Sequence, residues 1–196
     1  MARLVVVEHL TLDGVMQAPA RPDEDTRGGF TEGGWAVGFQ DPIMSATMAK
    51  SMMGGGALLL GRRTYDDFFK VWPTRKDNPF TDVLSRMTKY VASRAAGEDL
   101  PWENSILLIG EAAQTVAGLK LRSEETLTVL GSGMLVRSLV AANLVDEFLL
   151  TIHPLLLGAG QRLFADTGSP SKLKLIEAIP TSTGVLIGRY QPETTA

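Results

Sequence analysis

Two apolar runs in this chain end in glycine and pass directly into a helix-like segment. Leu58-Leu59-Leu60 leads into Gly61-Arg62-Arg63-Thr64, and Leu127-Thr128-Val129-Leu130 leads into Gly131-Ser132-Gly133. A strand, a glycine turn and a helix N-terminus together make an anion site. The first N–H groups of a helix lack partners there, and the helix dipole favours negative charge. Two such turns in one chain predict a ligand with more than one phosphate.

Three arginines accompany these turns and bear on the identity of that ligand. Arg62 and Arg63 follow the first glycine, and Arg94 follows Ser93 at the end of another apolar run. Arginine forks onto phosphate oxygens, and it commonly meets a ribose 2′-phosphate where an acidic residue would meet a free 2′-hydroxyl. The pattern therefore favours NADPH over NADH.

Each turn taken alone is equally compatible with a plain helix cap. The second turn lacks the third glycine of the dinucleotide fingerprint, and the chain has no Gly-Lys-Ser/Thr of a P-loop. It is the occurrence of both turns after apolar strands, with Ser93-Arg94 between them, that predicts a nucleotide site.

Composition narrows the class of protein. The 196 residues suit a single domain spanning 1–196, and the net charge of −3 gives no case for binding nucleic acid. The chain has no cysteine, which excludes thiolate metal sites and cysteine nucleophiles, and the histidines at 9 and 153 stand alone, so no metal site is expected. No apolar stretch approaches the roughly 20 residues of a membrane span, and we expect a cytoplasmic protein without a membrane partner.

The hydrophobic pattern predicts strands that alternate with helices and a hairpin at the end. The expected strands are residues 3–10, 57–60, 89–92, 105–109, 126–130, 145–153, 173–179 and 184–190. The first expected helix begins at Asp41-Pro42 and ends at the glycines 54–56. The other expected helices cover residues 65–71, 81–87, 112–119 and 134–143. This order predicts an α/β fold with a mostly parallel central sheet, helices on both faces and a C-terminal antiparallel hairpin.

A loop over residues 17–40 and two aspartates add candidate site residues. The loop is rich in glycine and charge but contains Phe30 and Trp35, which suits either a lid over an active site or a well-packed surface loop. Asp13 is either a turn former or a pocket carboxylate. Asp41 precedes Pro42 as an N-cap would.

In this order the segments resemble the dihydrofolate reductase-like superfamily, in the branch of the riboflavin-biosynthesis reductase domain and its small stand-alone members. That domain forms the C-terminal part of a bifunctional deaminase-reductase. The motifs that carry the resemblance lie at residues 10–15, 60–65, 89–94, 129–133, 144–160 and 163–164, so it covers nearly the whole chain, and the loop residues 24–30 and 33–35 resemble those of the small stand-alone members. The resemblance implies a dihydrofolate reductase-like fold and NADPH as cofactor. It also implies a homodimer, for which the apolar segment 148–157 is suited.

The resemblance assigns roles to individual residues. Those implied for the adenosine phosphates are Gly61, Arg62, Arg63, Thr64, Ser93 and Arg94, and those for the pyrophosphate are Gly131, Ser132, Gly133, Met134 and Leu135. Val7 and His9, together with Val5, would line the floor below the nicotinamide, and Phe30 and Trp35 would stand on the substrate and lid side.

One departure from the family concerns the proton donor. Dihydrofolate reductases carry a carboxylate on the first helix, whereas residues 43–53 of this chain contain none. This argues against folate reduction and leaves Asp13 and Asp41 as candidate catalytic residues, with a substrate hydroxyl or water as further sources of the proton. We expect an NADPH-dependent reductase of a small heterocyclic substrate, similar to 5-amino-6-(5-phosphoribosylamino)uracil reductase. The alternatives are a non-catalytic NADP(H)-binding or sensing protein and a dihydrofolate or xenobiotic reductase.

Overall fold

The computed structural model describes residues 1–53, 55–76, 78, 80–96, 99–164 and 170–193. They form two compact units. The first comprises Met1–Val6 and Ala49–Val145, and the second comprises Val7–Met48 and Asp146–Ala196. The strands are ordered β4-β3-β2-β5-β1-β6-β8-β7, and the first strand, β1 (Leu4–Thr11), contributes residues to both units.

The first unit is a parallel sheet. Its strands besides β1 are β2 (Ala57–Gly61), β3 (Thr88–Ser93), β4 (Ser105–Ile109) and β5 (Leu127–Val129). Every pairing among them is parallel, with Gly61 of β2 opposite Ala92 of β3 and Leu59 opposite Val129 of β5. All residues of β2 and β5 are buried, as expected of parallel strands covered on both faces. The carboxyl ends of β2, β3 and β5 therefore meet at one edge of this sheet.

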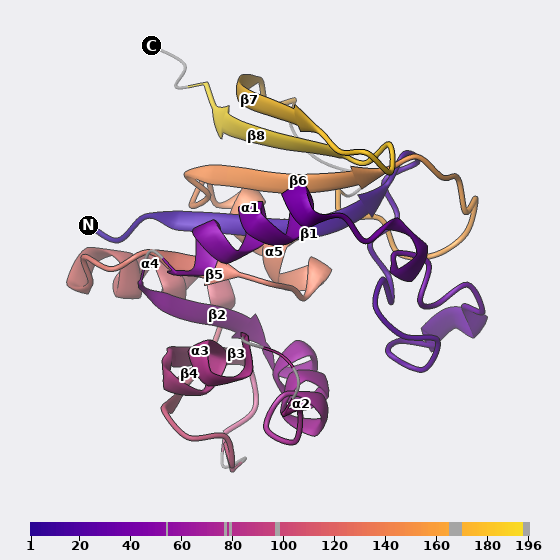
Figure 1. Ribbon diagram of the computed structural model, residues 1–196. Coiled ribbons are helices and arrows are strands. Elements are labelled where there is room, and N and C mark those ends of the chain that lie inside the picture. Colours follow the sequence, from indigo (N-terminus) through magenta and orange to yellow (C-terminus); the bar gives the residue numbers. More distant parts are fainter. Residues whose placement is uncertain (54, 77, 79, 97–98, 165–169, 194–196) are drawn as a thin grey trace. The chain divides into compact units, whose positions relative to one another are not determined.

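Four helices connect or follow these strands along the chain (Figure 1). They are α2 (Arg62–Val71), α3 (Phe80–Arg86), α4 (Ala112–Arg122) and α5 (Gly133–Ala141). Helix α2 packs on β2 and β3, α4 on β3 and β4, and α5 on β2.

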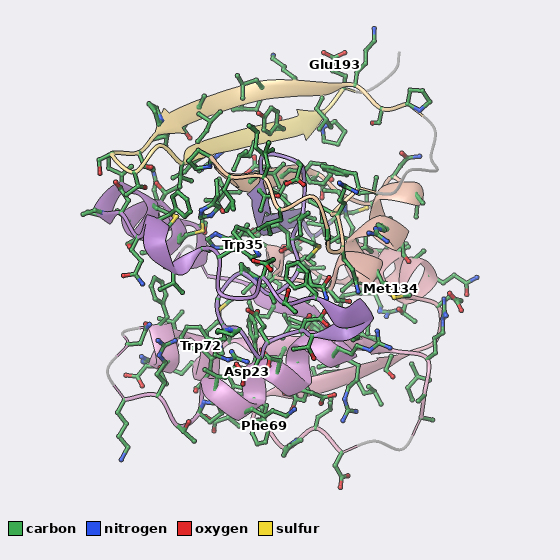
Figure 2. All side chains as sticks on the ribbon, turned by 90° about the vertical axis from the view of Figure 1, so that its right-hand side faces the viewer. Asp23, Trp35, Phe69, Trp72, Met134 and Glu193 are labelled. Carbon is green, nitrogen blue, oxygen red and sulfur yellow. The ribbon has the colours of Figure 1, made fainter. Side chains whose placement is uncertain are left out.

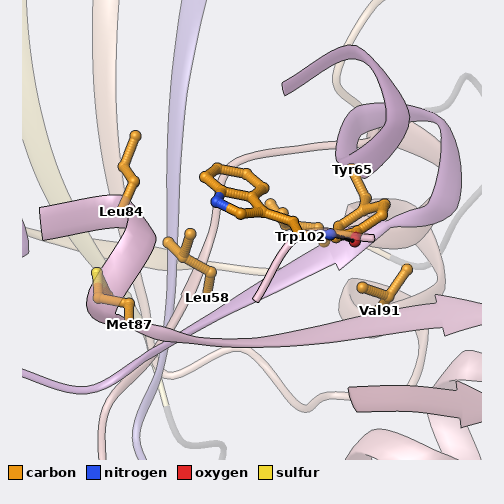
Figure 3. Packing of buried hydrophobic residues seen from close by; sticks show 7 residues of the cluster. Leu58, Tyr65, Leu84, Met87, Val91 and Trp102 are labelled. Carbon is orange, nitrogen blue, oxygen red and sulfur yellow. Dashed lines mark hydrogen bonds between the residues drawn. The ribbon is translucent and has the colours of Figure 1, made fainter. Parts of the chain in front are cut away.

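A cluster of buried hydrophobic side chains, which includes Tyr65 and Trp102, packs α2 and α3 against the strands (Figure 3). Tyr65 is fully buried, and its hydroxyl accepts a hydrogen bond from the main-chain N–H of Trp102 at 2.9 Å. Lys89 is buried beside Trp102, where its ammonium donates to three main-chain carbonyls and lies 4.6 Å from the indole centroid. Burial lowers the pKa of Lys89 to about 8. With all three donors occupied, this lysine supports the packing of the unit.

The second unit continues β1 and adds three strands and part of a helix, up to Met48. Strand β6 (Glu147–His153) pairs antiparallel with β8 (Leu186–Pro192), which pairs antiparallel with β7 (Leu173–Pro180); the three lie side by side in Figure 1. Helix α1 covers Pro42–Met53, and two short 3-10 turns, η1 (Arg27–Gly29) and η2 (Val37–Phe39), lie within the preceding loop.

The predicted α/β class, mostly parallel sheet and C-terminal hairpin are confirmed. Helix α2 begins at Arg62, not at Tyr65, so the arginines belong to the helix itself. The proposed helix stop at Gly54 falls on a residue outside the described ones. The segment 148–157, suggested as a dimer surface, is available only in part: residues 148–151 and His153 are buried within the chain because β6 is an inner strand, whereas Leu156 is exposed. No helix in the described part of the chain is both long and apolar enough to cross a membrane.

Candidate functional site

The two glycine turns of the first unit touch through their backbones. The Gly61 N–H donates to the Gly131 carbonyl at 3.2 Å, and Gly131 has a φ of +98°. A Cβ atom on Gly61 would lie 2.5 Å from Ser132 Oγ, well inside van der Waals contact. The peptide bond between Gly131 and Ser132 is cis. Gly61 therefore has no room for a side chain, and the turns after β2 and β5 are in direct contact.

Two helix N-termini open from this paired turn. Helix α2 starts directly after Gly61 and α5 directly after Ser132, and neither N-cap residue makes a side-chain capping bond. The N–H groups of the first turns, at Arg62, Arg63 and Thr64 and at Gly133, Met134 and Leu135, thus receive no acceptor from the caps. Such N–H groups, with the positive ends of two helix dipoles, suit an anion.

The three predicted arginines gather in this unit but differ in what they contact. Arg62 Nε lies 2.9 Å from Asp66 Oδ1, and its guanidinium lies 6.0 Å from the Tyr65 ring centroid. Arg94 Nε lies 2.9 Å from Glu111 Oε1. Arg63 is exposed and has no ion-pair or hydrogen-bond partner among the described residues. Arg63 is thus the cation of this group that a ligand meets without displacing a carboxylate.

Ser93 completes the group at the end of β3. Gly61, the last residue of β2, is paired with Ala92 of β3, so Ser93 at the end of β3 and Arg62 at the start of α2 are the next residues along the two segments. The Ser93 hydroxyl accepts a hydrogen bond from the Ala95 N–H at 3.2 Å, which turns the chain at this edge.

Asp13, in the second unit, ties two loops together. Its Oδ1 accepts from the Thr11 hydroxyl at 2.5 Å, and its Oδ2 accepts from the Gly158 N–H at 2.8 Å. The Thr11 hydrogen bond is the main cause that lowers the pKa of Asp13. The carboxylate therefore accepts one hydrogen bond from the end of β1 and one from the loop after β6.

Asp41 has a comparable structural task. Its Oδ1 accepts from the Ile43 N–H at 2.7 Å, which confirms the predicted N-cap of α1, and its Oδ2 accepts from the Ser182 N–H at 2.9 Å. The Ser182 hydroxyl also donates to this carboxylate and is the main cause that lowers the pKa of Asp41. Asp41 thus joins the start of α1 to the turn between β7 and β8.

The two histidines, treated in the sequence as isolated, form a pair. His9 Nδ1 lies 3.1 Å from His153 Nε2 and 2.9 Å from Thr151 Oγ1. Two aromatic rings from the 17–40 loop pack edge-on against His153, with centroid distances of 5.1 Å for Trp35 and 5.3 Å for Phe39. The contact spans 144 residues of chain, and no local sequence signal announces it.

The loop itself is held by named contacts. Trp35 (Figure 2) donates its indole N–H to the Gln17 carbonyl at 2.7 Å, and Phe30 is buried against Val15 and Ala18. Gln17 joins the two walls of a cavity of about 510 Å³, because its side chain donates to the Arg27 carbonyl and accepts from the Gln161 N–H. The predicted Phe30 and Trp35 are therefore ordered anchors of the second unit, as are Val7 and His9 on β1.

Glu8 is a site candidate that sequence reasoning missed. Its side chain is buried, and Oε1 has no hydrogen-bond partner among the described residues. Burial, reinforced by the charge of Glu24, raises the pKa of Glu8 to about 8. The group is therefore mostly protonated near neutral pH. The only hint in the sequence was a carboxylate at an inward position of a strand.

Known proteins bear out this architecture. The family model of the RibD C-terminal domain matches residues 3–187. The uncharacterized protein YyaP of Bacillus subtilis is 29% identical over 171 residues, covering 82% of this chain and 87% of that protein.

Two solved structures show the same fold. A putative riboflavin biosynthesis protein from Shewanella sp. PV-4 has a TM-score of 0.75 at 22% identity, covering 99% of this chain and all of that one. Dihydrofolate reductase from Enterococcus faecalis, solved with NADP(H), has a TM-score of 0.63 at 11% identity, covering 98% of this chain and 97% of that one.

Proposed function

Because this chain belongs to the RibD C-terminal domain family, we propose that it is an NADPH-dependent reductase of a small heterocyclic substrate. The membership supports a reductase-type function, and the finer assignment is to chemistry similar to that of 5-amino-6-(5-phosphoribosylamino)uracil reductase. The observation that carries the proposal is the paired turn in the first unit, where Gly61 meets Ser132 without room for a Cβ atom and two uncapped helices begin.

The residues of this turn fit a dinucleotide with several phosphates. Backbone N–H groups at the start of α5, in Gly133, Met134 and Leu135, would hold the pyrophosphate, since the N-cap Ser132 leaves them without a side-chain acceptor. The start of α2, with Thr64, and Ser93 would hold the adenosine phosphates. When bound, NADPH supplies a hydride, and the chain's own task is to hold cofactor and acceptor at reacting distance with water excluded.

The arginines would act with unequal ease. Arg63 can approach a phosphate directly, whereas Arg94 must first break its ion pair with Glu111. Both members of that pair are mostly exposed, with side chains 74% and 59% accessible, so the exchange costs little. Arg62 is held more firmly by Asp66 and Tyr65. We assign Arg94 and Arg63 to the 2′-phosphate and its neighbours.

In the second unit we propose that the aromatic side chains of the loop exclude water and that the two aspartates support structure. Asp13 and Asp41 accept hydrogen bonds with both carboxylate oxygens, and the pKa of each is lowered, so neither holds a proton for transfer near neutral pH. Their earlier candidacy as catalytic residues is therefore replaced by the loop-joining roles described above.

The central experiment compares NADPH and NADH binding by calorimetry for the wild type, Arg63→Ala and Arg94→Ala. We expect Arg94→Ala to weaken NADPH at least about tenfold more than NADH, because it removes a charged partner of the 2′-phosphate. Arg122→Ala, at the far end of α4, is the matched control. Equal loss for both cofactors would refute the 2′-phosphate role, and absence of NADPH binding by the wild type would refute the proposed function.

Turnover separates the enzyme from its main rival. NADPH oxidation with 5-amino-6-(5-phosphoribosylamino)uracil, followed by absorbance, supports the reductase. NADPH binding without oxidation of NADPH by pyrimidine or folate substrates would instead support a non-catalytic NADP(H)-binding protein, which the engaged state of Asp13 and Asp41 also permits.

We further propose a homodimer, with a surface that differs from the one expected. Strand β7 is an edge strand whose residues are nearly all exposed, and Leu175 and Ile176 are 52% and 44% accessible. Exposed apolar residues on an edge strand favour association. Light scattering should give twice the chain mass for the wild type and the monomer mass for Ile176→Lys. A wild-type monomer would exclude the dimer.

A further inference from the structure

The His9 ring is fixed through one nitrogen only. Its Nδ1 lies within hydrogen-bond distance of Thr151 Oγ1, at 2.9 Å, and of His153 Nε2, at 3.1 Å. The other nitrogen, Nε2, has no partner among the described residues, and the side chain keeps part of its surface accessible. One edge of the ring is therefore anchored while the other remains available to a ligand.

The Thr151 hydroxyl determines which nitrogen of His9 carries the proton. Thr151 Oγ1 also lies 3.1 Å from the Glu8 main-chain carbonyl. A carbonyl oxygen can only accept, so the hydroxyl proton is directed to Glu8 and the hydroxyl oxygen is left to accept from His9. His9 is then protonated at Nδ1, and its free Nε2 carries a lone pair.

His153 completes the same pattern. The Nε2 atom of His153 faces the Nδ1–H group of His9 and must accept from it. The ring proton of His153 is therefore on its own Nδ1 atom. That Nδ1 is buried and has no hydrogen-bond partner among the described residues. An unpaired buried N–H costs free energy. Here the ring packs against Trp35 and Phe39, and this packing offsets the cost. Burial lowers the pKa of both histidines to about 4, so both rings are neutral near pH 7.

We propose that His9 Nε2 is a substrate-contacting hydrogen-bond acceptor that recognises an N–H group on the edge of a neutral heterocycle, and that Thr151 and His153 are positioning residues that select its tautomer. This inference rests on the proposed reductase function and names the substrate chemistry of the second unit. A neutral acceptor favours a lactam or amino N–H over a phosphate or carboxylate. The aromatic rings of Trp35 and Phe39 nearby suit a flat ring.

Nitrogen NMR tests the tautomer without any substrate. The chain has two histidines, so ¹⁵N-histidine labelling yields four ring signals that a His153→Phe variant assigns. We expect His9 to be protonated at Nδ1 and bare at Nε2. Thr151→Val should redistribute the proton between the two nitrogens, and Thr151→Ser, which keeps the hydroxyl, should restore it. A wild-type His9 protonated at Nε2 would overturn the inference.

Kinetics with a matched pair of variants tests the substrate contact. Glutamine places its terminal amide near the position of histidine Nε2, whereas asparagine is too short to reach it. With 5-amino-6-(5-phosphoribosylamino)uracil as probe, we expect His9→Asn to raise KM about tenfold or more and His9→Gln to raise it much less. The pyrimidine should also shift the Nε2 signal of wild-type His9.

The outcomes separate the inference from the function on which it rests. Normal wild-type turnover with an unmoved Nε2 signal, or with equal KM for the two variants, overturns the role of His9 alone. A wild type that binds neither NADPH nor the pyrimidine overturns the proposed function and the substrate contact together, while the ring signals still decide the tautomer.

Discussion

Ser132 Oγ occupies the place that a side chain on Gly61 would need, 2.5 Å from the position of its Cβ atom. Gly61→Ala should therefore separate the two turns and lower NADPH affinity by about tenfold or more, because the helix N-termini no longer face a common anion. Calorimetry measures the effect. Gly38→Ala is the matched control, since nothing lies within 4 Å of its Cβ position. Adding Ser132→Ala to Gly61→Ala should recover part of the affinity, and no recovery would contradict the clash.

Asp41 should be worth more to stability than an ordinary helix cap. Asp41→Ala removes the N-cap of α1 and the anchor for Ser182, and we expect it to lower the free energy of unfolding by about 2–4 kcal/mol. Urea denaturation measures this. Asp82→Ala, an exposed aspartate in the first turn of α3, should change stability by less than about 1 kcal/mol. Equal effects of the two substitutions would show that the Ser182 contact contributes nothing.

Glu8 should make the protein less stable as the pH rises. Its pKa is raised in the folded state from 4.5 to about 8, so between these values the unfolded chain binds fewer protons than the folded one. The stability contributed by protonated Glu8 is complete below about pH 4.5 and is lost as the pH rises through about 8. In the Glu8→Gln variant this decline should be flatter. Near pH 8 its free energy of unfolding should exceed that of the wild type by on the order of a few kcal/mol. Denaturation at about pH 5 and pH 8 checks it, and an unchanged decline in the variant would contradict it.

The histidine pair should act in the opposite direction. The pKa of His9 and that of His153 are lowered from 6.5 to about 4, so the unfolded chain binds more protons in this range. Stability from the neutral pair is complete above about pH 6.5 and is lost as the pH falls through about 4. His153→Phe removes one of the chain's two histidines, so fewer protons are taken up on unfolding and the loss of stability toward acid pH should be shallower. The urea midpoint across this range is the measurement, and a slope equal to that of the wild type would refute the assignment.

Glu111 should compete with the cofactor for Arg94. Glu111→Gln frees the guanidinium from the pair, and we expect NADPH affinity to rise several-fold while NADH affinity stays constant. Because both groups are exposed, added salt should reduce the difference between wild type and variant. Glu124→Gln, another exposed substitution on the same unit, is the control. A parallel gain for NADH would place Arg94 away from the 2′-phosphate.

Local pattern was sufficient for most of the fold. The apolar runs before Gly61 and Gly131 predicted buried parallel strands, and Asp41-Pro42 predicted the start of α1, because these features depend on neighbours in the chain. The start of α2 was placed three residues late, since the arginines were read as loop rather than as the first helical turn.

The arrangement around His9 lay beyond any local pattern. A histidine at 9 and one at 153 become a hydrogen-bonded pair only when β1 and β6 are folded, and the same holds for the burial of Glu8. For Asp13 and Asp41, proposed from the sequence as candidate proton donors, the partners Gly158 and Ser182 lie more than a hundred residues away along the chain and have no local signal.

The sequence by itself determined the strands, the glycine turns and the cations beside them, because propensity, periodicity and glycine's freedom act over a few residues. Only the tertiary structure decided which of the arginines beside the turns lacks an ion-pair partner among the described residues, which carboxyl is protonated and which nitrogen of His9 is held by Thr151. Protonation state and hydrogen-bond direction depend on burial and on partners brought together across the fold.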